Sequence, residues 1–239
     1  MQYKRIAILM AMEQEALPII EYYKLKKTAF FNPVVIYSNK DESIVLSLNG
    51  KSTEFGIDNI GSQAGTLNAY ITIQNYSPDI IVNCGTAGGF SNKDTEIGDV
   101  FISNSRIIYH DRRISLPGGY TEYGIGFYKT INSDFIAKKL QLKQGLISTG
   151  DAFDLNEYDL KVMQENNVDV KEMEAAGIAW VCQLYNIDFT ALKAITDFVD
   201  KPHKTGEDFL KNLNYASKRL KNKAVELIDY LSTDNSSAA

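Results

Sequence analysis

The feature that most constrains this fold is the alternation of short β-branched runs with longer segments of helical periodicity along 239 residues. Such alternation is typical of βαβ units, whose helices cover the faces of a parallel or mixed sheet. The chain contains no internal repeat and no linker-like segment. The sequence therefore predicts a single α/β domain over residues 1–231, with a mixed central sheet flanked by helices, and a disordered tail over residues 232–239.

Individual elements follow from periodicity and turn residues. Pro18 is expected in the first turn of its helix, where it displaces no hydrogen bond. The glycines of GTAGGF (85–90) predict a turn, and those of the segment 110–124 predict a loop without regular structure. We expect strands at 4–10, 79–85, 98–109, 145–153, 168–174 and 189–200, a hairpin over 37–50, and helices at 11–23, 57–76, 175–186 and from Thr205 to Leu231.

Two helices carry specific packing predictions. The helix predicted at 57–76 is expected to bury Ile60, Ala64, Leu67 and Ile71, which fall at helical spacing. The last begins at Thr205-Gly206-Glu207-Asp208, the pattern of a capping box, and continues as an amphipathic helix. Its buried face should consist of Leu213, Ala216, Leu220, Ala224, Leu227 and Leu231.

Composition excludes several classes of function. A formal charge of -5 and a pI near 5.2 give no basic field for a nucleic acid. Apolar runs stop far short of the roughly 20 residues that cross a membrane, and the N-terminal stretch does not resemble a secretory signal. Cys84 and Cys182 lie far apart in apolar segments, which fits reduced thiols in a cytoplasmic protein. No zinc, P-loop or dinucleotide-binding pattern is present, so neither metal nor cofactor is expected.

Acidic and glycine-rich clusters each follow a predicted strand, where α/β sheets bind their ligands. They are AMEQE, GTAGG, STGDAF, EMEAAG and TDFVD. Taken singly, each has a structural explanation: a glutamate complements a helix dipole, and a glycine pair makes a tight turn. Together they predict an acidic pocket around Glu15, Glu174 and Asp197, away from His110 and His203, which are expected to be solvated.

Two carboxyl groups in different environments can divide acid and base work between them. Cleavage of a glycosidic bond uses such a pair, one to protonate the leaving group and one to activate water or stabilise the oxocarbenium-like transition state. The residues alone lead no further than this class of reaction.

The clusters, in this order and spacing, resemble the 5′-methylthioadenosine/S-adenosylhomocysteine nucleosidases of the purine nucleoside phosphorylase superfamily, most closely the plant-type branch. The matching segments are AMEQEA, GTAGGF with IGDVF, HDRRI, ISTGDAFD, VKEMEAAGIAWV, LKAITDFVD and EDFLKNL, which span nearly the whole chain. The resemblance implies a nucleoside phosphorylase-like domain that hydrolyses methylthioadenosine to adenine and methylthioribose.

The resemblance also assigns roles to residues. It implies that Glu15 is the general base for water and that Asp197 is the acid that protonates adenine. Glu174 would bind the ribose hydroxyls. Substrate binding would further involve Met12, Thr86, Ala87, Gly88, Phe153, Asp154, Lys171, Glu172 and Met173.

Two departures affect substrate breadth, since Phe153 replaces the leucine usual in the plant-type branch and Lys193 stands where bacterial members often have arginine. The resemblance further implies a homodimer in which loop 110–119 completes the neighbouring 5′-substituent pocket. That loop offers no evident site for a homocysteine zwitterion, so methylthioadenosine should be preferred. The alternatives are a phosphorolytic enzyme, a nucleosidase for another purine nucleoside, and a silent nucleoside-binding protein.

Overall fold

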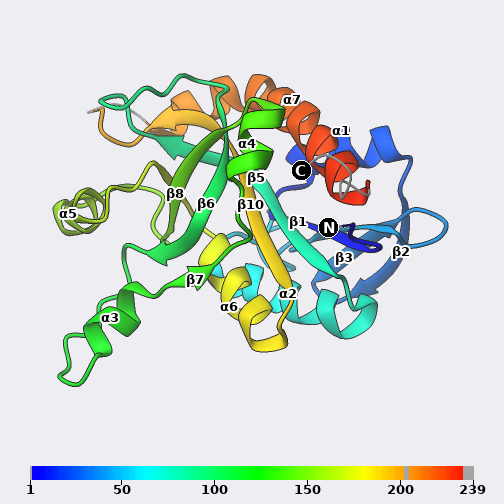
Figure 1. The fold of residues 1–239 in the computed structure, drawn as a ribbon, viewed down its shortest axis with the longest axis horizontal. Helices are drawn as coiled ribbons and strands as arrows, with labels where there is room; N and C mark the ends of the chain where they lie inside the picture. Colours follow the sequence, from blue (N-terminus) through cyan, green and yellow to red (C-terminus); the bar gives the residue numbers. More distant parts are fainter. Residues whose placement is uncertain (1, 202–204, 234–239) are drawn as a thin grey trace.

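A computed structural model describes residues 2–201 and 205–233. One mixed sheet lies between two layers of helices, as the sequence predicts (Figure 1). The strands are β1 (Ile6–Met10), β2 (Lys26–Phe31), β3 (Val34–Ser38), β4 (Ile44–Leu48), β5 (Ile80–Gly89), β6 (Val100–Tyr109), β7 (Tyr128–Lys129), β8 (Lys143–Thr149), β9 (Val170–Glu172) and β10 (Asp188–Phe198). The helices are α1 (Glu13–Tyr23), α2 (Ser62–Tyr76), α3 (Tyr120–Ile125), α4 (Asp134–Leu140), α5 (Glu157–Glu165), α6 (Ala175–Tyr185) and α7 (Thr205–Ser232).

Strand pairing brings the carboxyl ends of several strands to one edge. β10, β5, β1 and β4 are consecutive neighbours and all parallel. β10 also pairs antiparallel with β6, while β9 joins β5 to β8, so β5, β10, β6, β8 and β9 form a closed ring. The segments that follow β1, β5 and β10 therefore lie close together, which is the usual place for a ligand in a parallel sheet.

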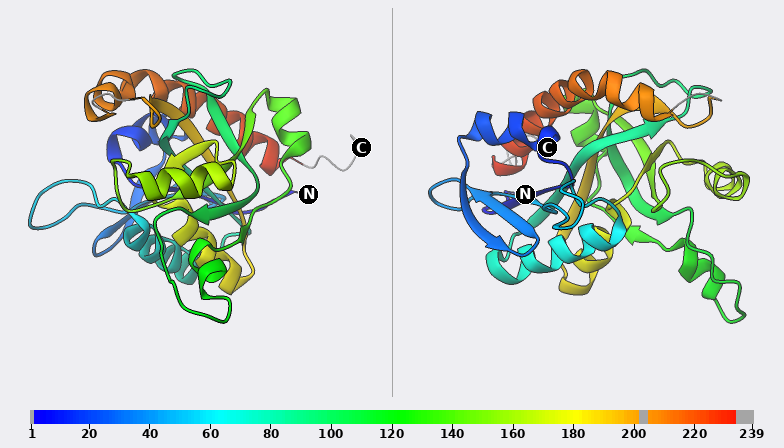
Figure 2. Two further views of the ribbon diagram at one scale, coloured as in Figure 1. Left: turned by 90° about the vertical axis from the view of Figure 1, so that its left-hand side faces the viewer. Right: turned by 180° about the vertical axis from the view of Figure 1, so that it is seen from behind.

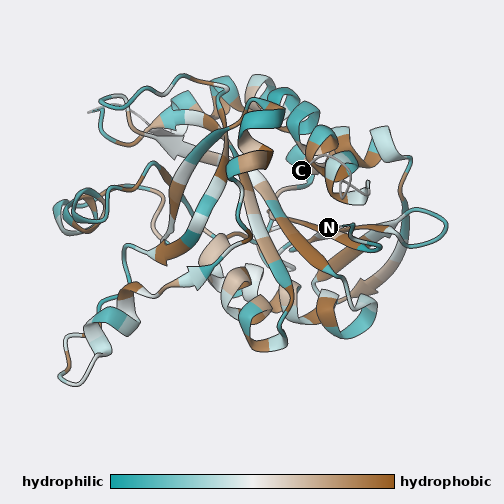
Figure 3. Cartoon of the chain, in the orientation of Figure 1, coloured by the Kyte–Doolittle hydropathy of each residue, from teal (hydrophilic) through white to brown (hydrophobic). Residues whose placement is uncertain are grey.

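The two faces of the sheet bury separate apolar clusters. α7 packs on one face beside α1 and α4, and α2 and α6 pack side by side on the other (Figure 1). Figure 3 shows the apolar residues on the central strands and polar residues along the outer side of α7. The predicted inner face of α7 is confirmed, because all six of its apolar residues are buried: Leu213, Ala216, Leu220, Ala224, Leu227 and Leu231.

The face that α2 buries differs from the prediction. Leu67 is exposed, and the buried residues include Gly65, Asn68 and Ala69 instead. Small residues are needed here because α6 lies very close: a side chain at Gly177 would stand 2.6 Å from the Ser62 carbonyl oxygen. Leu67 and Tyr70 remain exposed on the outer side of α2, while Ala69, Ile73 and Tyr76 are buried. The helix also begins at Ser62 rather than at residue 57, so Ile60 lies outside it and is exposed.

Three further local predictions are wrong. β5 continues through the glycines 85–89, which pair with β10 and β9 instead of forming a turn. Pro18 is the sixth residue of α1, in its second turn, where it leaves one backbone carbonyl without its usual donor. The segment 110–124 contains most of α3, because Gly119 and Gly126, both at positive φ, begin and end a short helix between them.

Of the two histidines, His110 is buried in the structure. His110 is 1% exposed and its Nδ1 lies 2.9 Å from Ser148 Oγ, which contradicts the predicted solvated side chain. Burial, with a contribution from Lys171, lowers its pKa to about 4. His203, the side chain of Thr205 in the capping box, and residues 234–239 of the predicted tail lie outside the described residues. Ser232, the first residue of the predicted tail, is still helical and ends α7, which contradicts that part of the prediction.

Cys84 and Cys182 are free and buried, as predicted. Over 2–201 and 205–233, no helix is long and apolar enough to cross a membrane. In that part of the chain, no group of three His, Cys, Asp or Glu side chains is arranged to hold a metal ion.

Candidate active site

A cavity of about 500 Å³ lies at the carboxyl ends of β1, β5 and β10. It brings together eleven of the twelve residues that the sequence selects, whereas Asp154 does not line it. The eleven are Met12, Glu15, Thr86, Ala87, Gly88, Phe153, Lys171, Glu172, Met173, Glu174 and Asp197.

The order of the strands spreads the site along one line. Asp197 ends β10, Thr86 lies on β5 and Glu15 follows β1, while Lys51 follows β4 at the far end. Neighbouring strands are about 4.8 Å apart, so a line across four of them is roughly the length of a nucleoside with a short 5′ substituent. An elongated ligand fits such a site.

Glu15 enters the cavity from the first turn of α1 and is only 3% exposed. Its Oε1 accepts hydrogen bonds from the Thr86 hydroxyl and from the Thr86 backbone N–H, the latter at 3.0 Å. Burial raises the pKa of Glu15, although both Thr86 hydrogen bonds and the charge of Lys193 act in the opposite direction. The second carboxylate oxygen lies over Gly85, where a side chain would stand 3.6 Å from it. Glycine at this position therefore leaves that oxygen accessible.

Asp197 is placed by an irregularity in β10. The pairing of β10 with β5 shifts register between Ile195 and Asp197, which re-aims the side chain as β-bulges commonly do. The Thr196 hydroxyl donates to Asp197 Oδ1 at 2.8 Å, and Oδ2 lies over Gly88. Burial raises the pKa of Asp197, and the nearby Lys171 opposes this effect. The group is therefore suited to carry a proton.

Glu172 and Lys193 form an ion pair beneath the cavity. Their charged atoms are 2.8 Å apart and both side chains are 1% exposed. Burial disfavours the charged form of Glu172, but Lys193 and hydrogen bonds from Thr149 and Glu174 hold its pKa below the ordinary value. Removing either partner would leave a buried charge uncompensated, which costs several kcal/mol. The ion pair therefore holds both side chains in a fixed position on this side of the cavity.

Glu174 lies at the start of α6 and is 8% exposed. Its Oε1 accepts the Gly61 backbone N–H at 2.8 Å. Burial raises the pKa of Glu174 to about 7, with Glu172 and Glu15 adding to the increase and Lys193 opposing it. The side chain can therefore exchange its proton near neutral pH.

The end of the cavity near Asp197 is aromatic. Phe153 and Phe209 meet edge to face with ring centroids 5.8 Å apart. Lys171 supports this end by donating from Nζ to the carbonyl oxygens of Ala152 and Phe153 at 2.7 and 2.9 Å. A flat ring could stack on such aromatic side chains.

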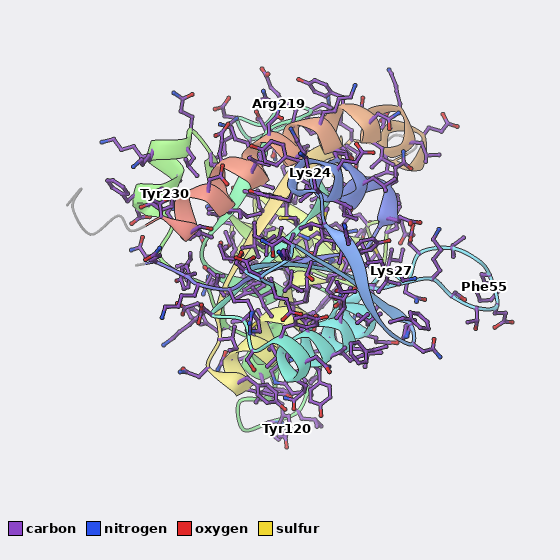
Figure 4. All side chains as sticks on the ribbon, turned by 90° about the vertical axis from the view of Figure 1, so that its right-hand side faces the viewer. Lys24, Lys27, Phe55, Tyr120, Arg219 and Tyr230 are labelled. Carbon is purple, nitrogen blue, oxygen red and sulfur yellow. The ribbon has the colours of Figure 1, made fainter. Side chains whose placement is uncertain are left out.

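The opposite end of the cavity is lined by the loop 51–59, which projects from the body of the molecule (Figure 2). Figure 4 shows Phe55 at the outer end of this loop. Lys51 and Asp58 line the cavity there, and Lys51 Nζ is 2.7 Å from Glu13 Oε2. The rim therefore combines apolar and charged groups.

Several of these residues escape prediction from sequence. Lys193 reads as a charge at the end of a strand, yet it is among the most buried side chains. The available signal is a lysine between apolar residues of a strand, because a buried lysine requires a partner. Lys51 and Asp58 lie in segments without a motif, and Phe209 lies in the segment EDFLKNL without a predicted role; only the folded chain brings the three to the cavity.

Comparison with known proteins agrees with this geometry. The model of the phosphorylase superfamily matches residues 5–229. The chain is 36% identical to 5′-methylthioadenosine nucleosidase of Arabidopsis thaliana, over 96% of this chain and 88% of that protein. The chain belongs to the phosphorylase superfamily, in the branch of the methylthioadenosine nucleosidases.

Two further relatives support the assignment. Identity to the 5′-methylthioadenosine/S-adenosylhomocysteine nucleosidase of Arabidopsis thaliana is 34%, over 95% of this chain and 91% of that one. The structure of the apo 5′-methylthioadenosine nucleosidase from the same plant superimposes with a TM-score of 0.93, at 34% identity and over 98% of both chains. The predicted family, including its plant-type branch, is thus confirmed.

Proposed function

We propose that this protein hydrolyses the N-glycosidic bond of 5′-methylthioadenosine to adenine and methylthioribose, without a cofactor or metal. The observation that carries the proposal is the pair of buried carboxyl groups with raised pKa, Glu15 and Asp197, at one cavity. The names of the Arabidopsis relatives support this choice of substrate.

Asp197 is the proposed acid. Because its pKa is raised, the carboxyl group can hold a proton and donate it to N7 of the adenine ring. The bond between C1′ and N9 then breaks with its electrons moving into the base, which leaves as neutral adenine. Phe153 is proposed to stack on the ring. Asp154, which the resemblance includes among the substrate-binding residues, does not line the cavity and has no part in this scheme.

Glu15 is the proposed base. A water molecule held by its carboxylate attacks C1′, and Glu15 accepts the proton that the water loses. Burial raises the pKa of Glu15 and so makes it a better proton acceptor than a solvated carboxylate. Thr86 fixes the side chain through Oε1, so that Oε2 remains available for the water.

Glu174 is proposed to accept hydrogen bonds from the ribose hydroxyls, and Met173 to pack on the sugar. The carboxylate, together with Glu15 and the Glu172–Lys193 pair, also surrounds the sugar with fixed charge. Groups of this kind stabilise positive charge on the ring as the glycosidic bond breaks. Proton transfer and electrostatic stabilisation are then the main tasks of the protein.

The charges at the cavity favour hydrolysis over phosphorolysis. Among its described lining residues, Lys51 and Lys171 are cationic, and Lys171 is already bound to two backbone carbonyls. The Glu15 carboxylate would repel a phosphate in place of water. Measuring adenine release from methylthioadenosine with and without phosphate tests the proposal. Release that requires phosphate and produces methylthioribose 1-phosphate would identify a phosphorylase instead.

A homodimer is proposed on the exposed apolar side of α2 and α6. Packing of a second copy would cover these side chains and could bring its loop 110–119, on the second projecting arm in Figure 2, to the open end of the cavity. Sedimentation of the purified protein tests this state. The exposed residues are Leu67, Tyr70, Trp180, Leu184 and Tyr185, with the rings of Tyr70 and Tyr185 6.2 Å apart.

A cytoplasmic location also remains a proposal. It is supported by the two free, buried cysteines, which fit a reducing compartment. Fractionation of cells that produce the protein would test it.

A further inference from the structure

The first turn of α2 contacts the carboxylate proposed to bind ribose. Gly61, the residue before this helix, has φ 102° and ψ 168°, a conformation essentially restricted to glycine. In this conformation its N–H donates to Glu174 Oε1 at 2.8 Å. Glycine adopts this conformation without a steric penalty, whereas a residue with a side chain would be strained, so the position requires glycine.

Asp151 holds the same turn from outside the cavity. Its Oδ1 accepts the Ser62 backbone N–H at 2.6 Å, and its Oδ2 accepts the Ser62 hydroxyl at 2.7 Å. A side chain at Gly61 would stand 2.9 Å from Asp151 Oδ1, so glycine is also required for this close approach. Asp151 in turn donates its own N–H to Asp111 Oδ2 at 2.6 Å, which anchors it to the loop 110–119.

This arrangement is more than an ordinary helix cap. A cap normally comes from a side chain at the residue before the helix, whereas Gly61 has none. The two carboxylates come instead from positions 89 and 113 residues away, and one of them is Glu174. Asp151 is not among the residues that line the cavity. Its contact with the site therefore runs through Ser62 and Gly61.

We propose that Asp151 is a positioning residue: by clamping Ser62 it keeps the Gly61 N–H on Glu174, and so fixes the orientation and the charge state of the carboxylate that binds ribose. This inference rests on the proposed function of Glu174. It assigns to Asp151, within the STGDAF segment, a task distinct from those of the residues that line the cavity.

The direction of the effect follows from the groups that face Glu174. Besides burial, Glu172 on β9 and Glu15 on α1 raise its pKa, while Lys193 on β10 and the Gly61 N–H lower it. Loosening the Gly61 N–H removes one of the groups that stabilise the charged form. The pKa of Glu174, about 7 in the intact site, should then increase.

Two variants test the clamp. Asp151→Asn keeps the shape of the side chain but loses its charge, and Ser62→Ala removes the hydroxyl contact alone. The first measurement is a ¹³C NMR titration of the glutamate carboxyl groups in the free protein, with the Glu174 signal assigned through Glu174→Gln. Hydrogen bonds to charged groups correspond to about one pKa unit. We expect an upward shift of about one unit in Asp151→Asn and a smaller one in Ser62→Ala.

The second measurement is the pH dependence of kcat/KM for methylthioadenosine. A one-unit shift lowers the ionised fraction of Glu174 about tenfold at pH well below its pKa. Asp151→Asn should therefore lose up to about tenfold in kcat/KM at pH 6 and recover most of it at pH 8.5. A purely structural defect would lower activity equally at both pH values.

Asp41→Asn is the matched control, because Asp41 holds Ser43 through the same two contacts, at 3.3 and 2.9 Å, in the turn between β3 and β4. It should leave both measurements unchanged. An unmoved Glu174 titration in Asp151→Asn and Ser62→Ala would overturn the inference. If Asp151→Asn does not fold, Ser62→Ala decides alone. The titration needs no turnover, so it remains decisive even if the wild-type protein releases no adenine and the proposed function fails.

Discussion

Glu174→Gln should stabilise the protein at alkaline pH while it damages activity. Burial raises the pKa of Glu174 to about 7 from the ordinary 4.5, so the folded protein binds this proton more tightly than the unfolded chain. Stability therefore falls as the pH rises from about 4.5 to about 7. At about 1.4 kcal/mol per pKa unit, the penalty above pH 7 is about 3 kcal/mol. Glutamine resembles the protonated form and avoids it.

Thermal unfolding at pH 5 and pH 8 measures this effect. A domain of this size shifts by roughly 2–4 °C per kcal/mol, so Glu174→Gln should raise Tm by roughly 6–12 °C at pH 8 and by much less at pH 5. Exposed Glu21 on α1 provides the control Glu21→Gln. Protein concentration must be equal throughout, because association also changes Tm. A Tm difference that is the same at both pH values would refute the argument.

Three other outcomes are expected. Asp197→Asn removes the proton donor, so steady-state kinetics should show a kcat lower by about 10²–10⁴. Calorimetry should show a near-normal affinity for a substrate analogue. A near-normal kcat would exclude Asp197 as the acid. Methylthioadenosine should show a higher kcat/KM than adenosylhomocysteine, and equal values for the two substrates would contradict this preference. Lys51→Met, a change at the rim of the cavity, should alter kcat/KM more for adenosylhomocysteine than for methylthioadenosine. Tyr185→Glu, which places a charge on the exposed apolar side of α6, should convert a dimer to a monomer by sedimentation, and an unchanged sedimentation coefficient would argue against this interface.

Local sequence predicts the elements of this fold well where apolar residues alone decide burial. The predicted inner face of α7 is apolar throughout, and β1 is a continuous apolar run buried on both faces. The glycines of β5 mislead, because a glycine run normally indicates a turn. Here Gly88 and Gly89 pair with Lys171 and Val170 of a strand that is distant in sequence. No local pattern reports such a pairing.

The prediction of the buried face of α2 is wrong for a different physical reason. Leu67 and Tyr70 remain exposed on one side of the helix, whereas Asn68 is fully buried and bonds to Ser47 and Asn49. Apolar residues at helical spacing can be covered by the same chain or by a second one, and the spacing does not distinguish the two. The exposed apolar side chains of α2 are the reason for proposing a second subunit there.

Most residues selected from motifs line the cavity, whereas Lys51 and Asp58, which also line it, and the residues that support it from outside were not selected. Motifs identify Glu15 and Asp197, but the burial of Lys193 and the clamp of Asp151 on Ser62 depend on contacts between distant segments. A charge in a strand reads as solvated until its partner is known. Residues that support a site through contacts with other residues are therefore the ones that a single sequence does not reveal.

The charges beneath the sugar suggest how the site distinguishes the transition state from the substrate. Glu15, Glu172 and Glu174 surround one fully buried lysine, Lys193, so the cluster is short of positive charge when all three are ionised. In the free protein, burial raises the pKa of Glu174 most, and the charges of Glu172 and Glu15 raise it further. A ribosyl ring that becomes cationic would supply the missing charge and favour the ionised form of Glu174. In the proposed mechanism, electrostatics that are unfavourable in the free protein would become favourable as the glycosidic bond breaks, which is the condition for catalysis by differential binding.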